Sequence, residues 1–155
     1  MKLLIKLYDI TNVSINILKQ VETIGCDEIM LPIYYEEDSL KSELTCNNSF
    51  LLVITNEDNL VLSFLIYTLD ENSVHIKSIC IKQQYKRYRL GSHLINYLKN
   101  NYNKVTLYVQ SINTVAFQFY KKNGFIIERD VIDYYQSLEH KQAYYMIYSK
   151  NRSIV

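Results

Sequence analysis

The middle of the chain contains the pattern that most restricts the fold, three β-type runs joined by short polar turns. The runs cover Phe50–Thr55, Leu60–Leu69 and Ser73–Lys82 and are rich in Leu, Ile and Val. The turns, 56–59 and 70–72, consist of Asn, Asp and Glu. Because turns this short join antiparallel neighbours, we predict an antiparallel meander.

A strand–helix–strand unit is expected to follow the meander. Leu90, Leu94 and Leu98 repeat at helical spacing around Gly91, and Lys104–Val109 has the pattern of a strand.

Further elements are expected towards both ends of the chain. Asn123-Gly124 is typical of a glycine C-cap and should end the last helix. The expected elements are a strand in Met1–Ile10, a helix capped by Thr11 and Asn12, a second helical stretch over Cys26–Asn47, a helix over Asn113–Lys122 and a strand over Ala143–Tyr148. The predicted order is β-α-α-β-β-β-α-β-α-β-β.

Length and charge restrict the class of protein. A chain of 155 residues with 48% hydrophobic residues favours a single domain over 1–155. A net charge of +1 and 21% charged residues argue against disorder and against a nucleic acid partner. The apolar runs are far shorter than the ~20 residues that span a bilayer, and Lys6 and Asp9 interrupt the N-terminal run. We therefore expect a cytoplasmic protein with no membrane partner.

The cysteines Cys26, Cys46 and Cys80 are expected to be packing residues. Their number is odd, and they lack the paired CxxC spacing of a zinc site. No metal site is expected.

A cluster of cations precedes the central helix. Lys86, Arg87 and Arg89 lie just before Gly91, where the helix begins. Unpaired amides and the positive end of the dipole make a helix N-terminus attractive to anions. The loop therefore suits a phosphate-bearing cofactor, although a solvated basic turn has the same composition.

The segment after Lys104–Val109 is more specific. Its residues Asn113, Ala116, Tyr120, Gly124 and Phe125 match the pattern N-x-x-A-x-x-x-Y-x-x-x-G-F. An upstream pattern, Q/R-x-x-G-x-G/A, falls on Lys86, Arg89 and Gly91. In both patterns the chain resembles the GNAT superfamily of acetyl-CoA-dependent N-acetyltransferases.

The resemblance implies an α+β fold of the GNAT type. Its mixed central sheet would have about six to seven strands, splayed between the fourth and fifth and flanked by about four helices. It also implies acetyl transfer from acetyl-CoA to a primary amine by direct attack in a ternary complex, without a metal. The acceptor would be a small-molecule or peptide amine, and the protein a monomer or homodimer. The alternative is a non-catalytic GNAT-fold module that binds acyl-CoA.

The resemblance also places the coenzyme. Main-chain groups of Ile79, Cys80 and Ile81 would pair with the pantetheine arm as a missing strand would. The other residues implied in binding are Lys86, Arg87, Tyr88, Arg89, Leu90, Gly91, Ser92, Asn113, Phe117 and Tyr120. Asn113 would also cap its helix.

Arg89 occupies the first glycine position of the upstream pattern. If that position requires a positive φ, arginine is strained there by ~1–2 kcal/mol. If it requires only a main-chain amide near the pyrophosphate, Arg89 donates its N–H and adds a guanidinium that can pair with phosphate. We favour the second interpretation.

Tyr120 and His75 are the candidate catalytic residues. By resemblance Tyr120 faces the coenzyme sulfur and protonates the leaving thiolate, although the same spacing fits a residue of the core. His75 lies six residues before Ile81 and is the candidate base; the alternative interpretation is an exposed or hydrogen-bonded strand histidine without a catalytic role. Many peptide N-terminal acetyltransferases of the family carry a glutamate at the position of Tyr108. An ordered water that passes the proton through His75 or Tyr108 is therefore a further candidate for the base.

Charge is distributed unevenly along the chain. Residues 1–58 contain four basic and ten acidic residues, a balance of −6, and residues 59–155 contain 13 basic and six acidic ones, a balance of +7. Because the resemblance places the acceptor against the first half, a cationic acceptor is expected, such as a polyamine, an aminoglycoside or a lysine-rich peptide.

Overall fold

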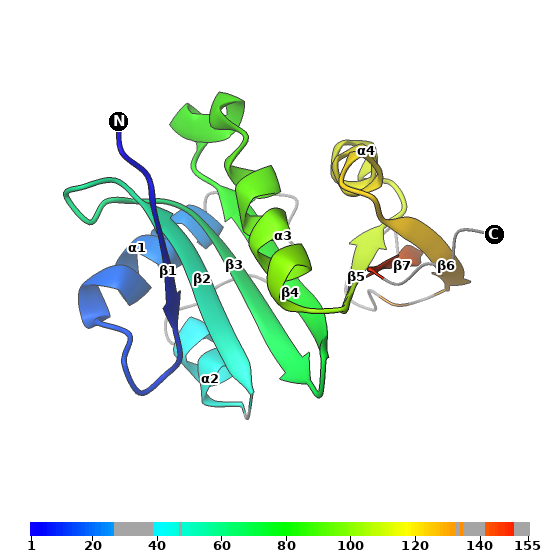
Figure 1. Cartoon of the computed structure of the whole chain (residues 1–155), viewed down its shortest axis with the longest axis horizontal. Coiled ribbons are helices and arrows are strands. Elements are labelled where there is room, and N and C mark those ends of the chain that lie inside the picture. Colours follow the sequence, from blue (N-terminus) through cyan, green and yellow to red (C-terminus); the bar gives the residue numbers. More distant parts are fainter. Residues whose placement is uncertain (27–38, 47, 133, 135–141, 151–155) are drawn as a thin grey trace.

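A computed structural model describes residues 1–26, 39–46, 48–132, 134 and 142–150 (Figure 1). The elements are β1 (Leu4–Tyr8), α1 (Ile15–Cys26), α2 (Ser39–Thr45), β2 (Ser49–Thr55), β3 (Val61–Asp70), β4 (Ser73–Ile81), the 3₁₀ helix η1 (Gln83–Tyr88), α3 (Leu90–Asn101), β5 (Lys104–Gln110), α4 (Thr114–Lys122), β6 (Ile126–Val131) and β7 (Ala143–Ser149). The predicted order of strands and α-helices is confirmed, and η1 is an addition to it.

The described strands form one seven-stranded sheet in the order β1-β2-β3-β4-β5-β7-β6. Neighbours are antiparallel except β4 and β5, which are parallel because α3 returns the chain to the same end of the sheet. The predicted α+β class and mixed sheet are therefore confirmed.

The β4–β5 seam, formed by Ser73–Ile81 and Lys104–Gln110, is paired over half its length. Ser73–Ile76 pair with Lys104–Leu107, and the pairing ends there. Directly afterwards the β3–β4 register shifts, which leaves Lys77 as a bulge opposite Ile66 and Tyr67. Figure 1 shows the two halves of the sheet diverging beyond this point, as the predicted splay requires.

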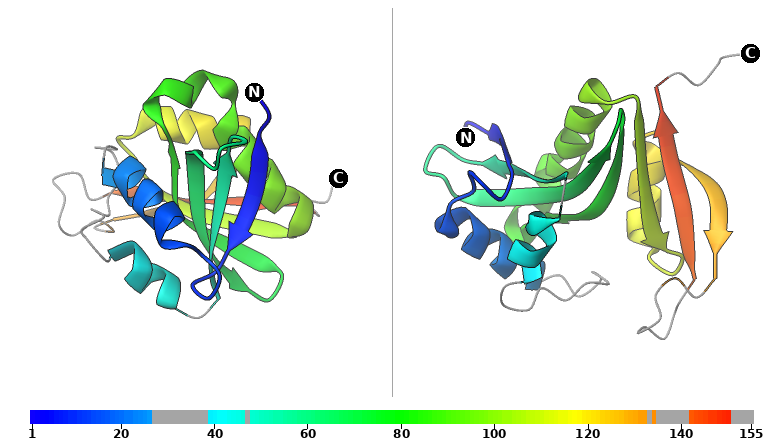
Figure 2. Two further views of the ribbon diagram at one scale, coloured as in Figure 1. Left: turned by 90° about the vertical axis from the view of Figure 1, so that its left-hand side faces the viewer. Right: turned by 90° about the horizontal axis from the view of Figure 1, so that it is seen from below.

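Two hydrophobic clusters lie on opposite faces of the sheet. One joins α3 and α4 to the strands through residues such as Leu94, Leu98 and Tyr120. The other joins α1 and α2 to β2 and β3 through residues such as Val21 and Leu44. Figure 2 shows α1 and α2 on one side of the β1–β4 half and α3 on the other.

The predicted cap of the first helix is wrong. Ser14 caps α1, because its Oγ accepts from the Ile17 amide at 3.2 Å. Thr11 and Asn12 instead form a turn with Asp9, whose carboxylate accepts from the Thr11 amide at 2.8 Å. Of the predicted stretch Cys26–Asn47, α2 is helical, and 27–38 lie outside the described residues.

Both predicted ends of α4 are confirmed. The Asn113 side chain accepts from the Ala116 amide at 3.1 Å. Gly124 has a φ of 91°, and the amides of Gly124 and Phe125 donate to the carbonyls of Lys121 and Tyr120 at 3.1 Å. This is a Schellman ending, which favours glycine at the left-handed position.

The cysteines differ in environment. Cys80 is 2% exposed and packs in the core as predicted, whereas Cys46 is exposed, so the packing prediction is wrong there. The Cys26 side chain lies outside the description. In the described part of the chain, no three His, Cys, Asp or Glu side chains gather as metal ligands could. No helix there has the length and apolarity to cross a membrane.

Candidate active site

The far end of β4 pairs with β3 but not with β5. Ile79 and Ile81 lie opposite Leu65 and Ser63 of β3, beyond the last residue of β4 that pairs with β5. Cys80 lies between them with its side chain buried. This end of β4 is therefore the part of the sheet at which an extended ligand could take the place of a strand.

The predicted basic loop is η1 together with the first turn of α3. Lys86, Arg87, Tyr88 and Arg89 are exposed. Arg89 adopts φ 56° and ψ 29°, which is the left-handed conformation. The interpretation that we favoured, a position without a positive φ, is therefore wrong: the chain turns between η1 and α3 at this residue, and an arginine there costs ~1–2 kcal/mol.

Gly91 is buried at the beginning of α3, and close packing explains why a residue without a side chain lies there. A Cβ at this position would lie 2.9 Å from Cζ of Phe119 and 3.2 Å from Cδ1 of Ile81. Glycine therefore lets α3 approach both α4 and β4 closely. The same contact joins the two sequence patterns in space, with buried Leu90 and half-buried Ser92 beside it.

Tyr120 lies on the inner side of α4. It is 7% exposed, and its ring packs edge-on against Phe119 at 5.2 Å and Phe125 at 5.6 Å between centroids. On the same helix Phe117 contacts Tyr144, with centroids 5.4 Å apart. Tyr120 is thus a residue of the core cluster, and its role as an acid stays a prediction.

His75 lies on the opposite face, since its neighbours Val74 and Ile76 belong to the cluster under α3. Its Nδ1 is 2.8 Å from Oγ1 of Thr106 on β5. Burial, and to a lesser extent the charge of Lys77, lowers the pKa of His75 to about 4. The imidazole is therefore neutral at pH 7 and hydrogen-bonded to the next strand, and the role of His75 as a base stays a prediction.

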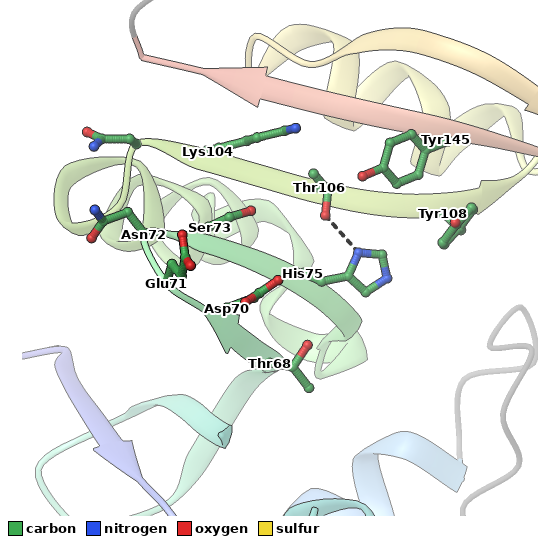
Figure 3. A pocket seen from close by; sticks show the side chains of 11 residues that line it. Thr68, Asp70, Glu71, Asn72, Ser73, His75, Lys104, Thr106, Tyr108 and Tyr145 are labelled. Atoms are coloured by element: carbon green, nitrogen blue, oxygen red, sulfur yellow. Dashed lines mark hydrogen bonds between the residues drawn. The ribbon is translucent and has the colours of Figure 1, made fainter. Parts of the chain in front are cut away.

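A pocket of about 600 Å³ surrounds His75 (Figure 3). The side chains of Thr68, Thr106, Tyr108 and Tyr145 line it from β3, β5 and β7. The β3–β4 turn adds Asp70, Glu71 and Asn72, and Ser73, Asn103 and Lys104 complete the lining.

Tyrosines form the aromatic side of this pocket. The Tyr108 ring lies edge-on to His75 with centroids 5.4 Å apart, and it stacks on Tyr134 at 4.2 Å. Tyr145 is 4.9 Å from Tyr108.

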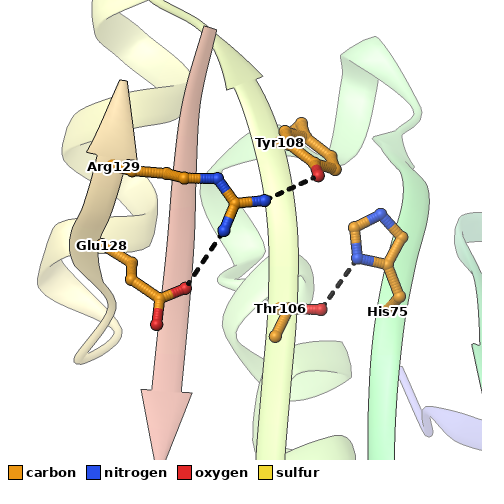
Figure 4. Close-up of polar contacts among 5 residues, drawn as sticks. All are labelled: His75, Thr106, Tyr108, Glu128 and Arg129. Carbon is orange, nitrogen blue, oxygen red and sulfur yellow. Dashed lines mark hydrogen bonds and ion pairs between the residues drawn. The ribbon is translucent and has the colours of Figure 1, made fainter. Parts of the chain in front are cut away.

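Arg129 of β6 contacts two of these tyrosines, and Figure 4 shows it beside Tyr108. Its Nη2 donates to the Tyr108 hydroxyl at 3.4 Å, and its guanidinium lies 4.3 Å from the centre of the Tyr145 ring. Nη1 of the same guanidinium lies 3.8 Å from Oε2 of Glu128. Sequence reasoning missed Arg129 and Tyr145 because only the β6–β7 register makes them neighbours. Strand alternation from Tyr108 could have indicated Thr106.

The structure therefore separates the predicted residues into two groups on opposite faces of the seam. Leu90 at the end of the basic loop and Tyr120 belong to the cluster under α3 and α4, and His75 and Tyr108 lie in the pocket. Five of the ten acidic residues in 1–58 lie outside the described residues, namely Asp27, Glu28, Glu36, Glu37 and Asp38.

Comparison with known proteins gives consistent matches. The family model described as an acetyltransferase (GNAT) domain matches residues 19–132. The catalytic subunit NAA20 of the N-terminal acetyltransferase B complex from Arabidopsis thaliana is 34% identical over 71 residues, which span 42% of this chain and 41% of that protein. N-alpha-acetyltransferase 50 from Danio rerio is 24% identical over 152 residues, 93% of this chain and 88% of that one.

Solved structures share the fold. Arabidopsis thaliana Naa50 in complex with the bisubstrate analogue CoA-Ac-MVNAL superimposes with a TM-score of 0.72 at 21% identity, covering 94% of this chain and 98% of that one. Spermidine N-acetyltransferase from Vibrio cholerae in complex with CoA and spermine also gives 0.72, at 15% identity and 96% coverage of both chains.

Proposed function

The chain belongs to the GNAT acetyltransferase family, and we propose that it transfers an acetyl group from acetyl-CoA to a primary amine by direct attack in a ternary complex. The observation that carries this proposal is the half-paired β4–β5 seam, with an exposed basic loop beyond the unpaired end of β4 and a neutral histidine in a pocket on the opposite face. A thioester held along the unpaired end of β4 would be accessible to an amine from the pocket.

The chain's own residues fit the coenzyme. Lys86, Arg87 and Arg89 are exposed and directly precede the first amides of α3, where a pyrophosphate would gain both charge and hydrogen bonds. Gly91 keeps that helix end close to β4. Main-chain groups of Ile79 and Ile81, with Cys80 between them, would bind the pantetheine arm, and one of them would polarise the thioester carbonyl. Asn113 and Phe117 of the α4 region would complete the binding residues.

Two proton transfers accompany the exchange of a C–S bond for a C–N bond. His75 accepts a proton from the attacking nitrogen, which becomes far more acidic once it bonds to the acetyl carbon. A pKa of about 4 keeps the imidazole neutral but makes it a weak base, so it accepts the proton only from a nitrogen that is already bonded to the acetyl carbon. Tyr120 donates its phenol proton to the departing sulfur; a thiol near ~8.5 and a phenol near ~10 are close enough in pKa for this exchange.

The acceptor that we propose is the α-amine of a peptide. The support comes from the two sequence relatives, one named as an N-terminal acetyltransferase subunit and one as an N-alpha-acetyltransferase. Tyr108 and Tyr145 line the pocket and offer aromatic contact area to a peptide. A polyamine is the second candidate, favoured by Asp70 and Glu71 in the lining of the pocket.

Release of CoA thiol in the presence of acetyl-CoA tests the proposal. The panel contains peptides with a free α-amine, the same peptides blocked at the α-amine but containing lysine, and spermidine. We expect turnover with the free peptides, and mass spectrometry should place the acetyl group on the α-nitrogen. Acetyl-CoA binding without acetylation of any amine would instead select the non-catalytic module.

The proposal extends to residues 1–155 as one acetyltransferase domain. The first and last described strands, Leu4–Tyr8 and Ala143–Ser149, belong to the same sheet, which supports this extent.

A further inference from the structure

We infer that Thr106 is a positioning residue that determines which ring nitrogen of His75 carries the proton. The inference rests on the proposed function and deepens it, because it concerns how the candidate base becomes able to accept a proton. It starts from a row of polar residues across the sheet: Thr68, His75 and Thr106 are neighbours in register on β3, β4 and β5.

Thr106 has two partners, and they restrict its hydroxyl. Its Oγ1 lies 2.8 Å from Nδ1 of His75 and 3.5 Å from the carbonyl oxygen of Val74. A carbonyl can only accept, so a hydroxyl that donates to Val74 presents its lone pair to the imidazole. Nδ1 must then carry the proton, and Nε2 keeps the lone pair that a base requires.

The opposite assignment has a different chemical consequence. If the Thr106 hydroxyl donated to Nδ1, Nε2 would carry the proton of the neutral ring and could only donate. Thr106 is 5% exposed, so water has little access to take over its role. Within the described residues, Thr106 is the one hydrogen-bond partner of the His75 ring.

Among the described residues, the other groups around His75 make no hydrogen bond to its ring, so they do not determine which ring nitrogen carries the proton. The Tyr108 ring contacts the imidazole through its edge, and Lys77 acts on it only through charge. The remaining titratable groups of the pocket, Asp70 and Glu71 from the β3–β4 turn, Lys104 from β5 and Tyr145 from β7, line it without a hydrogen bond to the ring.

Nitrogen-15 NMR of the histidine rings tests the inference without any assay of activity. The sequence has three histidines, so His75→Gln assigns the signal of His75. We expect the Nδ1–H tautomer in the wild type and in Thr106→Ser, and a shift to Nε2–H in Thr106→Val. Thr55→Val is the matched control, because Thr55 is also a buried strand threonine but has no hydrogen-bond partner for its hydroxyl among the described residues. An Nε2–H tautomer in the wild type would overturn the inference.

Kinetics provide the second readout. Hydrogen-bond partners of metal-ligating histidines contribute ~10–100-fold, and we expect an effect of the same order here: Thr106→Val should lower kcat by that factor while the KM for acetyl-CoA stays within ~3-fold. Thr106→Ser should restore kcat, and Thr55→Val should leave it unchanged. Equal kcat losses in both valine variants would indicate a general effect on the fold and overturn the positioning role.

The inference and the proposed function fail in distinguishable ways. If no amine is acetylated, the proposed function fails, and the NMR result alone decides the orientation of His75. If the wild type is active and His75→Gln is equally active, the base is another group and the inference falls with it. If kcat falls in His75→Gln but not in Thr106→Val, His75 keeps its role as the base and only the positioning role of Thr106 is overturned.

Discussion

Replacing Arg89 with glycine separates the conformational cost of this residue from its charge. The left-handed conformation of Arg89, with φ 56°, costs a side chain ~1–2 kcal/mol. Glycine removes that cost but gives up ~0.5–1 kcal/mol of backbone entropy on folding. Arg89→Gly should therefore stabilise the apo protein by up to ~1.5 kcal/mol, which raises the Tm by up to ~6 °C in a chain of this size.

The same substitution should weaken coenzyme binding. A guanidinium that pairs with phosphate contributes ~1.5–3 kcal/mol as a charge-assisted hydrogen bond, so the Kd for acetyl-CoA should rise by ~10–150-fold. Arg89→Glu should weaken binding at least as much and keep the conformational strain. The two variants thus agree in affinity and differ in stability.

Thermal unfolding and calorimetric titration with acetyl-CoA measure the two effects separately. Lys150→Glu is the control, since Lys150 is exposed and follows β7, outside the loop. A lower Tm for Arg89→Gly would contradict the strain argument. An equal loss of affinity at Lys150 would show that the effect is one of overall charge and not of a phosphate site.

Three further outcomes are expected. Tyr120→Phe should lower kcat by ~10²–10⁴ with little change in acetyl-CoA affinity, and an unchanged kcat with chemistry rate-limiting would return Tyr120 to the core alone. Gly124→Ala should destabilise the protein by ~1–2 kcal/mol in chemical unfolding, because alanine pays for the left-handed conformation at φ 91°. Since the pKa of His75 is lowered to about 4, stability should be complete above the unfolded pKa near ~6.5 and fall as the pH drops towards 4, because only the unfolded chain gains the proton. His75→Gln should flatten that slope, and a slope unchanged in this variant would contradict it.

Local patterns were sufficient for most of the fold. The β-type runs, the polar turns between them and Gly124 each constrain the backbone through their own residues, so their positions agree with the structure. The spacing of Asn113, Tyr120 and Gly124 likewise fixes the cap, the inner face and the end of α4.

Features decided by competition between neighbouring residues, by the junction of two elements or by the pairing of distant strands were not predictable in this way. Ser14 competes with Thr11 and Asn12 for the cap of α1, and the Asp9 turn decides the outcome. Arg89 has a positive φ because the chain turns there from η1 into α3, and arginine as a residue type does not predict a positive φ. Arg129 reaches Tyr108 only because β6 pairs with β7.

The bulge at Lys77 relates the fold to the proposed chemistry. With strict alternation, Ile79 and Ile81 would share a face with His75. The extra residue reverses the alternation, so both isoleucines pack against the cluster under α3, and Ile81 reaches the Gly91 contact. A bulge also bends its strand, and here β4 leaves β5 at this point. The pairing therefore ends at this one inserted residue, which also places Ile79 and Ile81 on a different face from His75. An amine at His75 and a sulfur near Tyr120 would then meet across the seam, each beside its own proton-transfer group.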